Sequence, residues 1–174
     1  MLRRLVGSEM CIRDRWFMLS DSPPEKDINW TDSGINGAWK ICQKIWMIVQ
    51  NNKENLKKTA NSNEKTYQGK SLDFIRIIHQ NLHAITQSIE IILMNVSIAK
   101  VFEIDNAISK FQIEDEEGKE AINEALHILI RVIEPMVPHL AEECWSLVGK
   151  SETIMDEPWP TTCLLYTSDA ADDA

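Results

Sequence analysis

Four lysines are the side chains whose types and spacing best suit contact with phosphate groups. Lys40 and Lys44 are four residues apart, which places them one turn apart on one face of a helix, and Lys57 and Lys58 follow near the end of the same predicted helix. A local strip of positive charge on an acidic protein can contact the phosphates of a nucleic acid. A solvated helix face explains the same spacing, so these four lysines are candidates for such a contact.

Two histidines have the spacing of a metal site but lack the partners for one. His79 and His83 are four residues apart, so a helix would place both imidazoles on one face. No cysteine or carboxylate accompanies them at ligand spacing, and the glutamate of a zinc-protease helix is missing. The sequence therefore predicts no metal site.

The other polar residues do not form a catalytic pattern. Glu142 and Glu143 flank an apolar helix face and are interpreted as surface carboxylates. Gly34 and Gly37 lie inside a predicted helix instead of between a strand and a helix, where a phosphate-binding loop would place them. We predict no catalytic residue and no cofactor-binding residue. A glycine inside a helix costs about 1 kcal/mol relative to alanine, so both positions suggest the close approach of another backbone.

Composition narrows the class of protein. The chain has 174 residues and a formal net charge of -9, which argues against a non-specific nucleic-acid binder with a basic face. No run of about 18 apolar residues is present, so we expect no membrane span. The cysteines follow no metal-ligand spacing and indicate a reduced, cytoplasmic protein. They are Cys11, Cys42, Cys144 and Cys163.

The two ends of the chain read as translated sequencing adapters. Residues 9–15 read EMCIRDR and residues 163–168 read CLLYTS. The adapter strand GAGATGTGTATAAGAGACAG encodes the first peptide, and the complementary strand TGTCTCTTATACACATCT encodes the second. Two short natural tails are the alternative. We expect residues 1–15 and 163–174 to be artefact tails, so the predicted fold covers only the residues between them.

Between these ends the apolar residues recur at helical spacing. Intervals of three and four predict a first helix over residues 31–56, and no segment shows the alternation of a strand. Proline at positions 135 and 138 should interrupt the fourth helix. The prediction is an all-α, up-down bundle of four main helices plus a short C-terminal helix. The later helices are expected around Ile75–Ile92, from a cap at Asn95, after the acidic run ending at Gly118, and over His139–Val148.

Two blocks of sequence carry a family resemblance. The first has the pattern Pro-Pro-Glu-x-Asp, then Trp, then Gly-Ile-x-Gly-Ala, and the second reads IEPMVPHLAEECW over residues 133–145. Both resemble the leucyl-tRNA synthetases, which are class I aminoacyl-tRNA synthetases, and a Pro-Trp-Pro segment at residues 158–160 matches as well. The family usually has arginine where Lys40 and Lys44 stand. Lysine keeps the charge and loses the two-pronged geometry of a guanidinium group. The first block is formed by Pro23, Pro24, Glu25, Asp27, Trp30, Gly34, Ile35, Gly37 and Ala38.

The resemblance implies a role and a domain organisation. Residues 16–30 would be a linker from the catalytic domain, and residues 31–162 the anticodon-binding helical bundle. The parent enzyme would be a cytoplasmic monomer that activates leucine with ATP and magnesium and transfers it to tRNA. This part would dock the tRNA and brace the catalytic domain. The catalytic His-x-Gly-His and Lys-Met-Ser-Lys-Ser motifs do not occur in this sequence, so the chain alone should be inactive.

Two other interpretations remain open. An isoleucyl- or valyl-tRNA synthetase fits the second block but not the Pro-Pro-Glu-x-Asp pattern. A stand-alone, non-catalytic helical binding module fits the lack of an active site.

Overall fold

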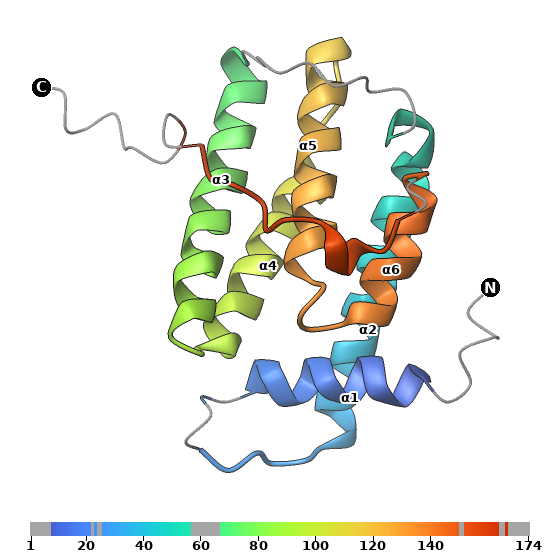
Figure 1. Ribbon diagram of the computed structural model, residues 1–174, viewed down its shortest axis with the longest axis vertical. Coiled ribbons are helices and arrows are strands. Elements are labelled where there is room, and N and C mark those ends of the chain that lie inside the picture. Colours follow the sequence, from blue (N-terminus) through green and yellow to red (C-terminus); the bar gives the residue numbers. More distant parts are fainter. Residues whose placement is uncertain are drawn as a thin grey trace, which may run out of the picture.

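The computed structural model describes residues 8–21, 23, 26–56, 67–149, 152–163 and 166, and these residues form helices and loops without a strand (Figure 1). The predicted all-α class is therefore confirmed. The helices are α1 (Ser8–Asp21), α2 (Asp32–Leu56), α3 (Gly69–Glu90), α4 (Met94–Lys110), α5 (Glu116–Val132) and α6 (Pro138–Leu147), followed by the short 3-10 helix η2 (Ile154–Asp156). No helix among the described residues is long and apolar enough to cross a membrane.

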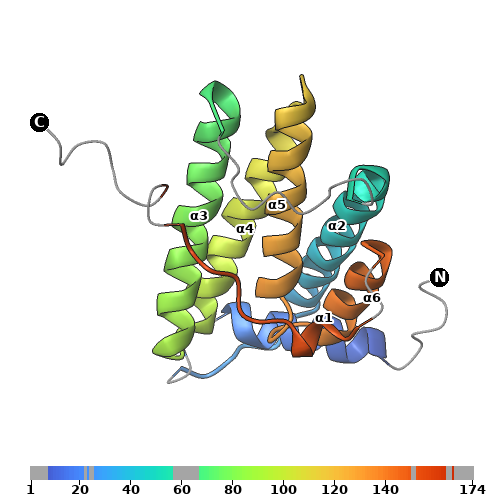
Figure 2. The same ribbon diagram turned by 45° about the horizontal axis from the view of Figure 1, so that its top comes forward.

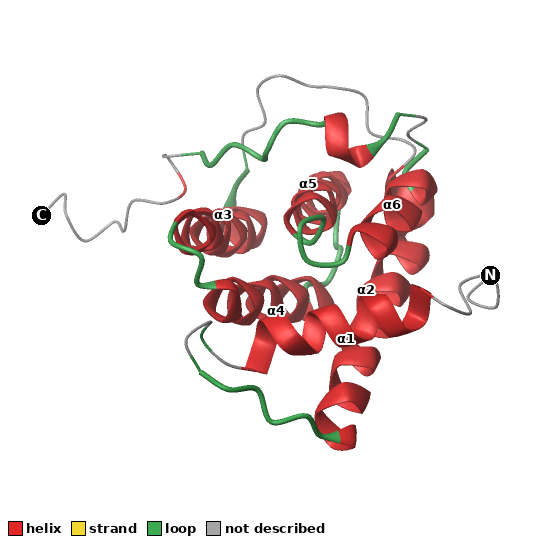
Figure 3. Cartoon of the chain, turned by 60° about the horizontal axis from the view of Figure 1, so that its bottom comes forward, coloured by secondary structure: helices red, strands yellow, loops and turns green. Residues whose placement is uncertain are grey.

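The helices stand side by side, with α1 lying across one end of them (Figure 2). Helices α3 and α4 form an antiparallel pair, and α5 packs on both of them. Helix α2 packs against α5 and α6 on the other side, and α1 contacts α2, α4 and α6 (Figure 3). Helices α2 to α5 are the four main helices of the predicted bundle, and α6 is the short one.

The ends of α5 and α6 follow directly from the sequence. Asp115 caps α5, since its carboxylate accepts a hydrogen bond from the backbone N–H of Gly118 at 2.7 Å. Glu116 and Glu117 occupy the first turn, where negative charge complements the helix dipole. The helix ends at Val132, before the two prolines, and α6 begins with Pro138, which needs no hydrogen bond there.

The core consists mainly of aliphatic side chains at helical spacing. On α3 the stripe of Ile75, Ile78, Leu82 and Ile85 is fully buried. Helix α3 packs against α4 and α5, and removing one such buried side chain to alanine typically costs about 2–5 kcal/mol. The spacing that predicts these helices also predicts their buried faces. The buried residues of α5 include Ile122, Ala125, Leu126, Leu129 and Ile130.

Helix α1 was not predicted, since residues 1–15 were set aside as an artefact tail and residues 16–30 were expected to be a linker. The structure forms a helix across the predicted boundary at residue 15, and Trp16 and Phe17 are buried on it. The rings of Trp16 and of Phe102 on α4 are nearly perpendicular, at a centroid distance of 6.0 Å. Burial of two large aromatic rings stabilises this helix, although its own apolar pattern is weak. The domain boundary at residues 15 and 16 stays a prediction.

The start of α4 also differs from the expectation. Asn95 was predicted to cap this helix, but α4 begins at Met94, and Leu93, two residues before Asn95, holds the cap position without a side-chain hydrogen bond. Asn95 lies in the first turn instead. The preceding turn places Ile92 at a φ of 61°, the left-handed region that isoleucine rarely adopts. Because of this tight turn, the helix begins two residues sooner than it would after a cap at Asn95.

After α6, residues 152–163 run back across the bundle as an extended strap (Figure 1). The carboxylate of Glu142 accepts a hydrogen bond from the backbone N–H of Ile154 at 3.0 Å. Further along, the indole N–H of Trp159 donates to the hydroxyl of Thr86 on α3 at 2.9 Å. The strap thus ties α6 to α3, and its path depends on side chains that are far apart in sequence.

Candidate nucleic-acid interface

Helix α2 carries the two predicted lysines that the structure describes. Lys40 is exposed and Lys44 is half-buried, one turn further along. Lys57 and Lys58 lie outside the described residues. Ser33, Gly37, Lys40 and Lys44 recur at intervals of three and four, so they share one face of α2. We call these four residues the α2 face.

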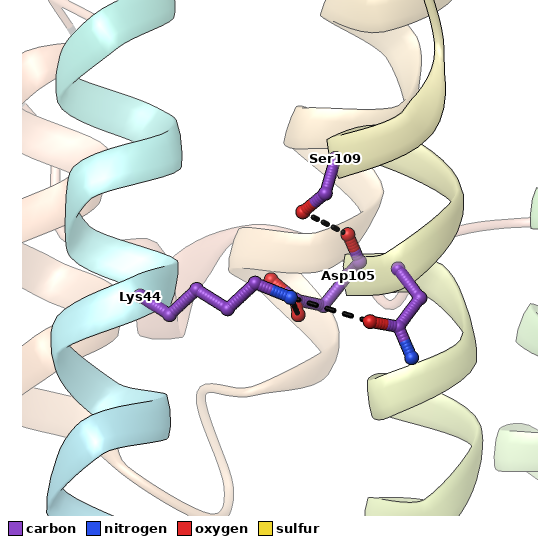
Figure 4. A network of polar contacts seen from close by, with 4 residues as sticks. Lys44, Asp105 and Ser109 are labelled. Atoms are coloured by element: carbon purple, nitrogen blue, oxygen red, sulfur yellow. Dashed lines mark hydrogen bonds and ion pairs between the residues drawn. The ribbon is translucent and has the colours of Figure 1, made fainter.

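Lys44 is held by α4 (Figure 4). Its ammonium group forms an ion pair with the Oδ2 atom of Asp105 and lies 3.3 Å from the Oδ1 atom of Asn106. The Asp105 side chain is 2% exposed, whereas that of Lys44 is 43% exposed. On the same helix, the hydroxyl of Ser109 donates to the backbone carbonyl of Asp105 at 2.8 Å. The ion pair therefore joins α2 to α4 at the edge of the core.

Charge balance explains why Lys44 takes this position. A buried carboxylate without a partner is costly, and the other oxygen of Asp105, Oδ1, already has no hydrogen-bond partner. The lysine supplies the compensating charge. Two of its three N–H donors point at Asp105 and Asn106, so any phosphate would have to share an ammonium that is already largely neutralised. Spacing alone suggested equal roles for Lys40 and Lys44, but their environments differ.

Lys40 makes no ion pair within the described parts of the chain. Several other described cations form an ion pair with a carboxylate on the same helix, on another helix or in a loop. Lys40 therefore presents one full charge to solvent on the α2 face, which an incoming anion could use. The paired cations are Arg13 with Asp14, Lys70 with Glu114, Arg76 with Asp73, Lys100 with Glu103, and Lys119 with Glu116.

The two glycines of α2 also have different environments. A Cβ atom on Gly34 would lie 2.4 Å from the Phe17 ring, so the predicted close approach is present, although a side chain makes it instead of a backbone. A Cβ atom on Gly37 would meet nothing within 4 Å. For Gly37 the predicted close approach is wrong within this chain, because its side of α2 faces open space. The α2 face thus combines a bare stretch of helix backbone with the exposed charge of Lys40.

A second polar cluster was missed by the sequence analysis. The Nε2 atom of His79 lies 2.9 Å from a carboxylate oxygen of Glu124, and the Tyr67 hydroxyl donates to the other oxygen at 2.8 Å. The Nδ1 atom of His79 accepts a hydrogen bond from the backbone N–H of Cys163 at 3.2 Å, so Nε2 carries the ring proton. Tyr166 lies beside the imidazole ring, at a centroid distance of 5.3 Å. These contacts join the end of the strap to α3 and α5.

This cluster supports packing and offers no catalytic group. Burial, together with the negative charge of Glu124, raises the pKa of Tyr67 above its ordinary value, so the phenol stays protonated. His83, the other member of the histidine pair, is exposed. Across the described residues, no three His, Cys, Asp or Glu side chains gather closely enough to hold a metal ion. The partners are 45 and 57 residues apart in sequence, which is why spacing could not reveal them.

The buried thiols are likewise structural. Burial raises the pKa of both Cys42 and Cys144 to about 12, and the nearby charge of Glu143 adds to the effect at Cys144. A protonated, buried thiol is a poor nucleophile at neutral pH. Neither residue has the environment of a catalytic cysteine.

The later helices of this bundle, from α3 onward, match a known class of domain. Residues 73–172 match the family described as the anticodon-binding domain of tRNA ligase. The chain belongs to this family of anticodon-binding domains.

Curated relatives within this class are leucine--tRNA ligases. The chain is 42% identical over 146 residues to the leucine--tRNA ligase of Parvibaculum lavamentivorans and 41% identical over 150 residues to that of Maricaulis maris. Each match covers 84% of this chain and 17% of the relative, so the chain spans about a sixth of the length of these proteins.

A solved structure has the same fold. It is the LeuRS of Agrobacterium radiobacter K84, in a ternary complex with tRNA and LeuAMS. The TM-score is 0.82 at 21% sequence identity, and the match covers 97% of this chain and 21% of that one. At this identity the likeness concerns the fold alone.

Proposed function

We propose that residues 31–162 are the anticodon-binding bundle of a leucine--tRNA ligase, preceded by a linker at residues 16–30, and that they dock tRNA and brace the catalytic domain. The observation that carries this proposal is the 42% identity to a leucine--tRNA ligase over 84% of the chain. The structural neighbour was solved with tRNA, which supports RNA as the partner. The parent enzyme would be a cytoplasmic monomer that uses ATP and magnesium to join leucine to tRNA.

Within this role, the α2 face is the proposed point of RNA contact. Lys40 offers an exposed charge without a competing carboxylate among the described residues, and Gly37 leaves the helix backbone beside it uncovered. Lys44 contributes mainly by joining α2 to α4. Lys57 and Lys58, which lie outside the described residues, stay candidates from the sequence alone. The net charge of -9 means that a few placed lysines, and not a broad basic surface, would guide the tRNA.

Recovery of the whole gene tests the proposed function. The coding DNA would be extended on both sides, and the full-length protein would be assayed for attachment of leucine to its tRNA, with isoleucine and valine as controls. We expect leucine-specific charging of tRNA and in-frame His-x-Gly-His and Lys-Met-Ser-Lys-Ser motifs upstream. Charging with isoleucine or valine, or a complete gene that lacks these motifs, would contradict the proposal.

The 174-residue chain alone provides a second test. It lacks the catalytic motifs, so we expect no leucine-dependent exchange of pyrophosphate into ATP. The full-length enzyme is the positive control in the same assay. Exchange activity in the short chain would show that its function is not the proposed one.

A further inference from the structure

A hollow lies between the start of α3 and the loop that joins α4 to α5. It encloses about 490 Å³, and residues of α3, of this loop and of the first turn of α5 line it. We call it the α3–α5 hollow. Both helices begin at the end of the bundle opposite α1 (Figure 1). Sites for small ligands commonly have this size, so the lining decides which ligand would fit.

The first turn of α3 offers backbone donors that this chain does not use. Gln68 holds the cap position without a side-chain hydrogen bond, and the first backbone bond of the helix runs from the N–H of Leu72 to the carbonyl of Gln68 at 3.3 Å. The N–H groups of Gly69, Lys70 and Ser71 therefore have no acceptor among the described residues. A Cβ atom on Gly69, which has a φ of 49°, would meet nothing within 4 Å, so this turn is open.

Ser71 is a second, independent observation at the same place. It lines the hollow, and only 7% of the residue is exposed. Its hydroxyl has no hydrogen-bond partner within the described parts of the chain, whereas the buried hydroxyls of Ser88 and Ser97 bond to each other at 2.8 Å. Leaving a buried hydroxyl unpaired is costly. An oxygen atom of a ligand in the hollow would accept its hydrogen bond.

The charges around the hollow restrict the kind of ligand. The unused donors favour an anionic oxygen, but three carboxylates and one ammonium line the hollow, which makes it negative. This surplus repels a simple anion such as phosphate. A ligand with both a carboxylate and an ammonium group suits both features. The carboxylates are already held by the chain: Glu114 by the Lys70 ammonium, Asp115 by the N–H of Gly118, and Glu117 by the N–H of Gln68, each at 2.7 Å.

We propose that the α3–α5 hollow binds a small zwitterion of the α-amino acid class. The ligand carboxylate would accept hydrogen bonds at the start of α3, where the helix dipole also favours negative charge. Its ammonium group would lie against the carboxylate of Glu114. An apolar side chain would face Phe111, which lines the hollow and stacks on Phe74 at a centroid distance of 4.2 Å. This site goes beyond the proposed function and does not depend on it.

Three probes that differ by one charged group test the proposal. L-alanine, propionate and ethylammonium are titrated into the 174-residue chain at constant ionic strength, and the backbone amide resonances are followed by NMR. We expect saturable shifts at Gly69, Lys70 and Ser71 with L-alanine. Its affinity should exceed that of propionate and of ethylammonium by about tenfold, because each of these lacks one of the two charged contacts. Inorganic phosphate should bind no better than propionate.

Two variants test the assigned contacts. Ser71→Ala should weaken the binding of L-alanine about tenfold, because it removes a donor to the ligand carboxylate. Glu114→Gln should weaken L-alanine but strengthen propionate, because it removes a negative charge and releases Lys70 from its ion pair. Ser146→Ala is the matched control. The exposed hydroxyl of Ser146 donates to the carbonyl of Glu143 on α6, so this change should leave all affinities unchanged.

Three results would overturn the proposal. The lack of saturable shifts at the start of α3 would show that the hollow binds no amino acid. Equal affinities for L-alanine and propionate would show that the ammonium group is not recognised. Tighter binding of phosphate would make the hollow a plain anion site. The amide spectrum reports whether each variant is folded, and Glu114→Gln decides the matter if Ser71→Ala is not. Leucine charging by the full-length enzyme is a separate readout, so the proposed function can fail or stand on its own.

Discussion

Helix α2 contains two glycines and two lysines, and the two members of each pair have different environments. Gly34 lies against the Phe17 ring, and Lys44 forms an ion pair with the buried carboxylate of Asp105. Gly37 and Lys40, on the same helix, face open space and solvent. Residue type and spacing therefore identify a helix face, while contacts with neighbouring helices decide which residues of that face remain available for a partner.

The largest expected effect is a loss of stability on replacing Lys44, the lysine that is paired with Asp105. Lys44→Met should destabilise the chain by about 3 kcal/mol, because it leaves the buried Asp105 carboxylate without a compensating charge. Asp105→Leu should cost much less, since Lys44 is 43% exposed and can return to solvent. Urea unfolding of both variants measures the difference. Little or no loss for Lys44→Met would mean that the pair contributes little, and that Lys44 is as free as Lys40.

The two glycines should respond to alanine with opposite signs. Gly34→Ala places a methyl group 2.4 Å from the Phe17 ring and should destabilise the chain by about 2 kcal/mol. Gly37→Ala meets no atom within 4 Å and should stabilise it by up to about 1 kcal/mol, because alanine favours the helix. The two variants act as controls for each other in the same unfolding experiment. A loss of stability in both would contradict the open space at Gly37.

The exposed lysine should affect RNA binding and not the fold. In the full-length enzyme, Lys40→Glu should weaken tRNA binding several-fold and reduce the slope of log affinity against log salt by about 1. Lys110→Glu, at the end of α4, is the matched charge reversal elsewhere on the surface. The double reversal of Lys40 and Lys44 would be a poor test, because a glutamate at position 44 would face Asp105 and disturb the fold. Unchanged binding by Lys40→Glu would leave the α2 face as a solvated surface.

The smallest effect concerns Gly37 in the whole enzyme. If tRNA or another domain approaches the bare backbone of α2, Gly37→Ala should lower kcat/KM for tRNA about two- to tenfold, although it stabilises the short chain. Steady-state charging at varied tRNA concentration measures this change. Full activity of the alanine variant would show that the space at Gly37 stays empty during the reaction.

Much of the bundle could be predicted from apolar spacing. Intervals of three and four located α2, α3 and α5, and the prolines located the break before α6, because each of these signals acts within a few residues. The predicted cap at Asn95 is wrong because the strained turn at Ile92 is followed by a cap two residues earlier, at Leu93. Helix α1 was missed because its stability comes from burying Trp16 and Phe17 against other helices.

The candidate site shows the same division. The sequence alone determined the class of fold, the buried stripes and the presence of lysines on one face of α2, since these depend on local period and charge. Only the tertiary structure decided that Lys44 is paired while Lys40 is exposed. It also decided that Gly34 lies against the Phe17 ring while no atom lies near Gly37. Asp105 lies 61 residues from Lys44 along the chain, so no local pattern links them. Contacts between distant residues arise from packing the helices together, and that packing assigns each exposed or buried role.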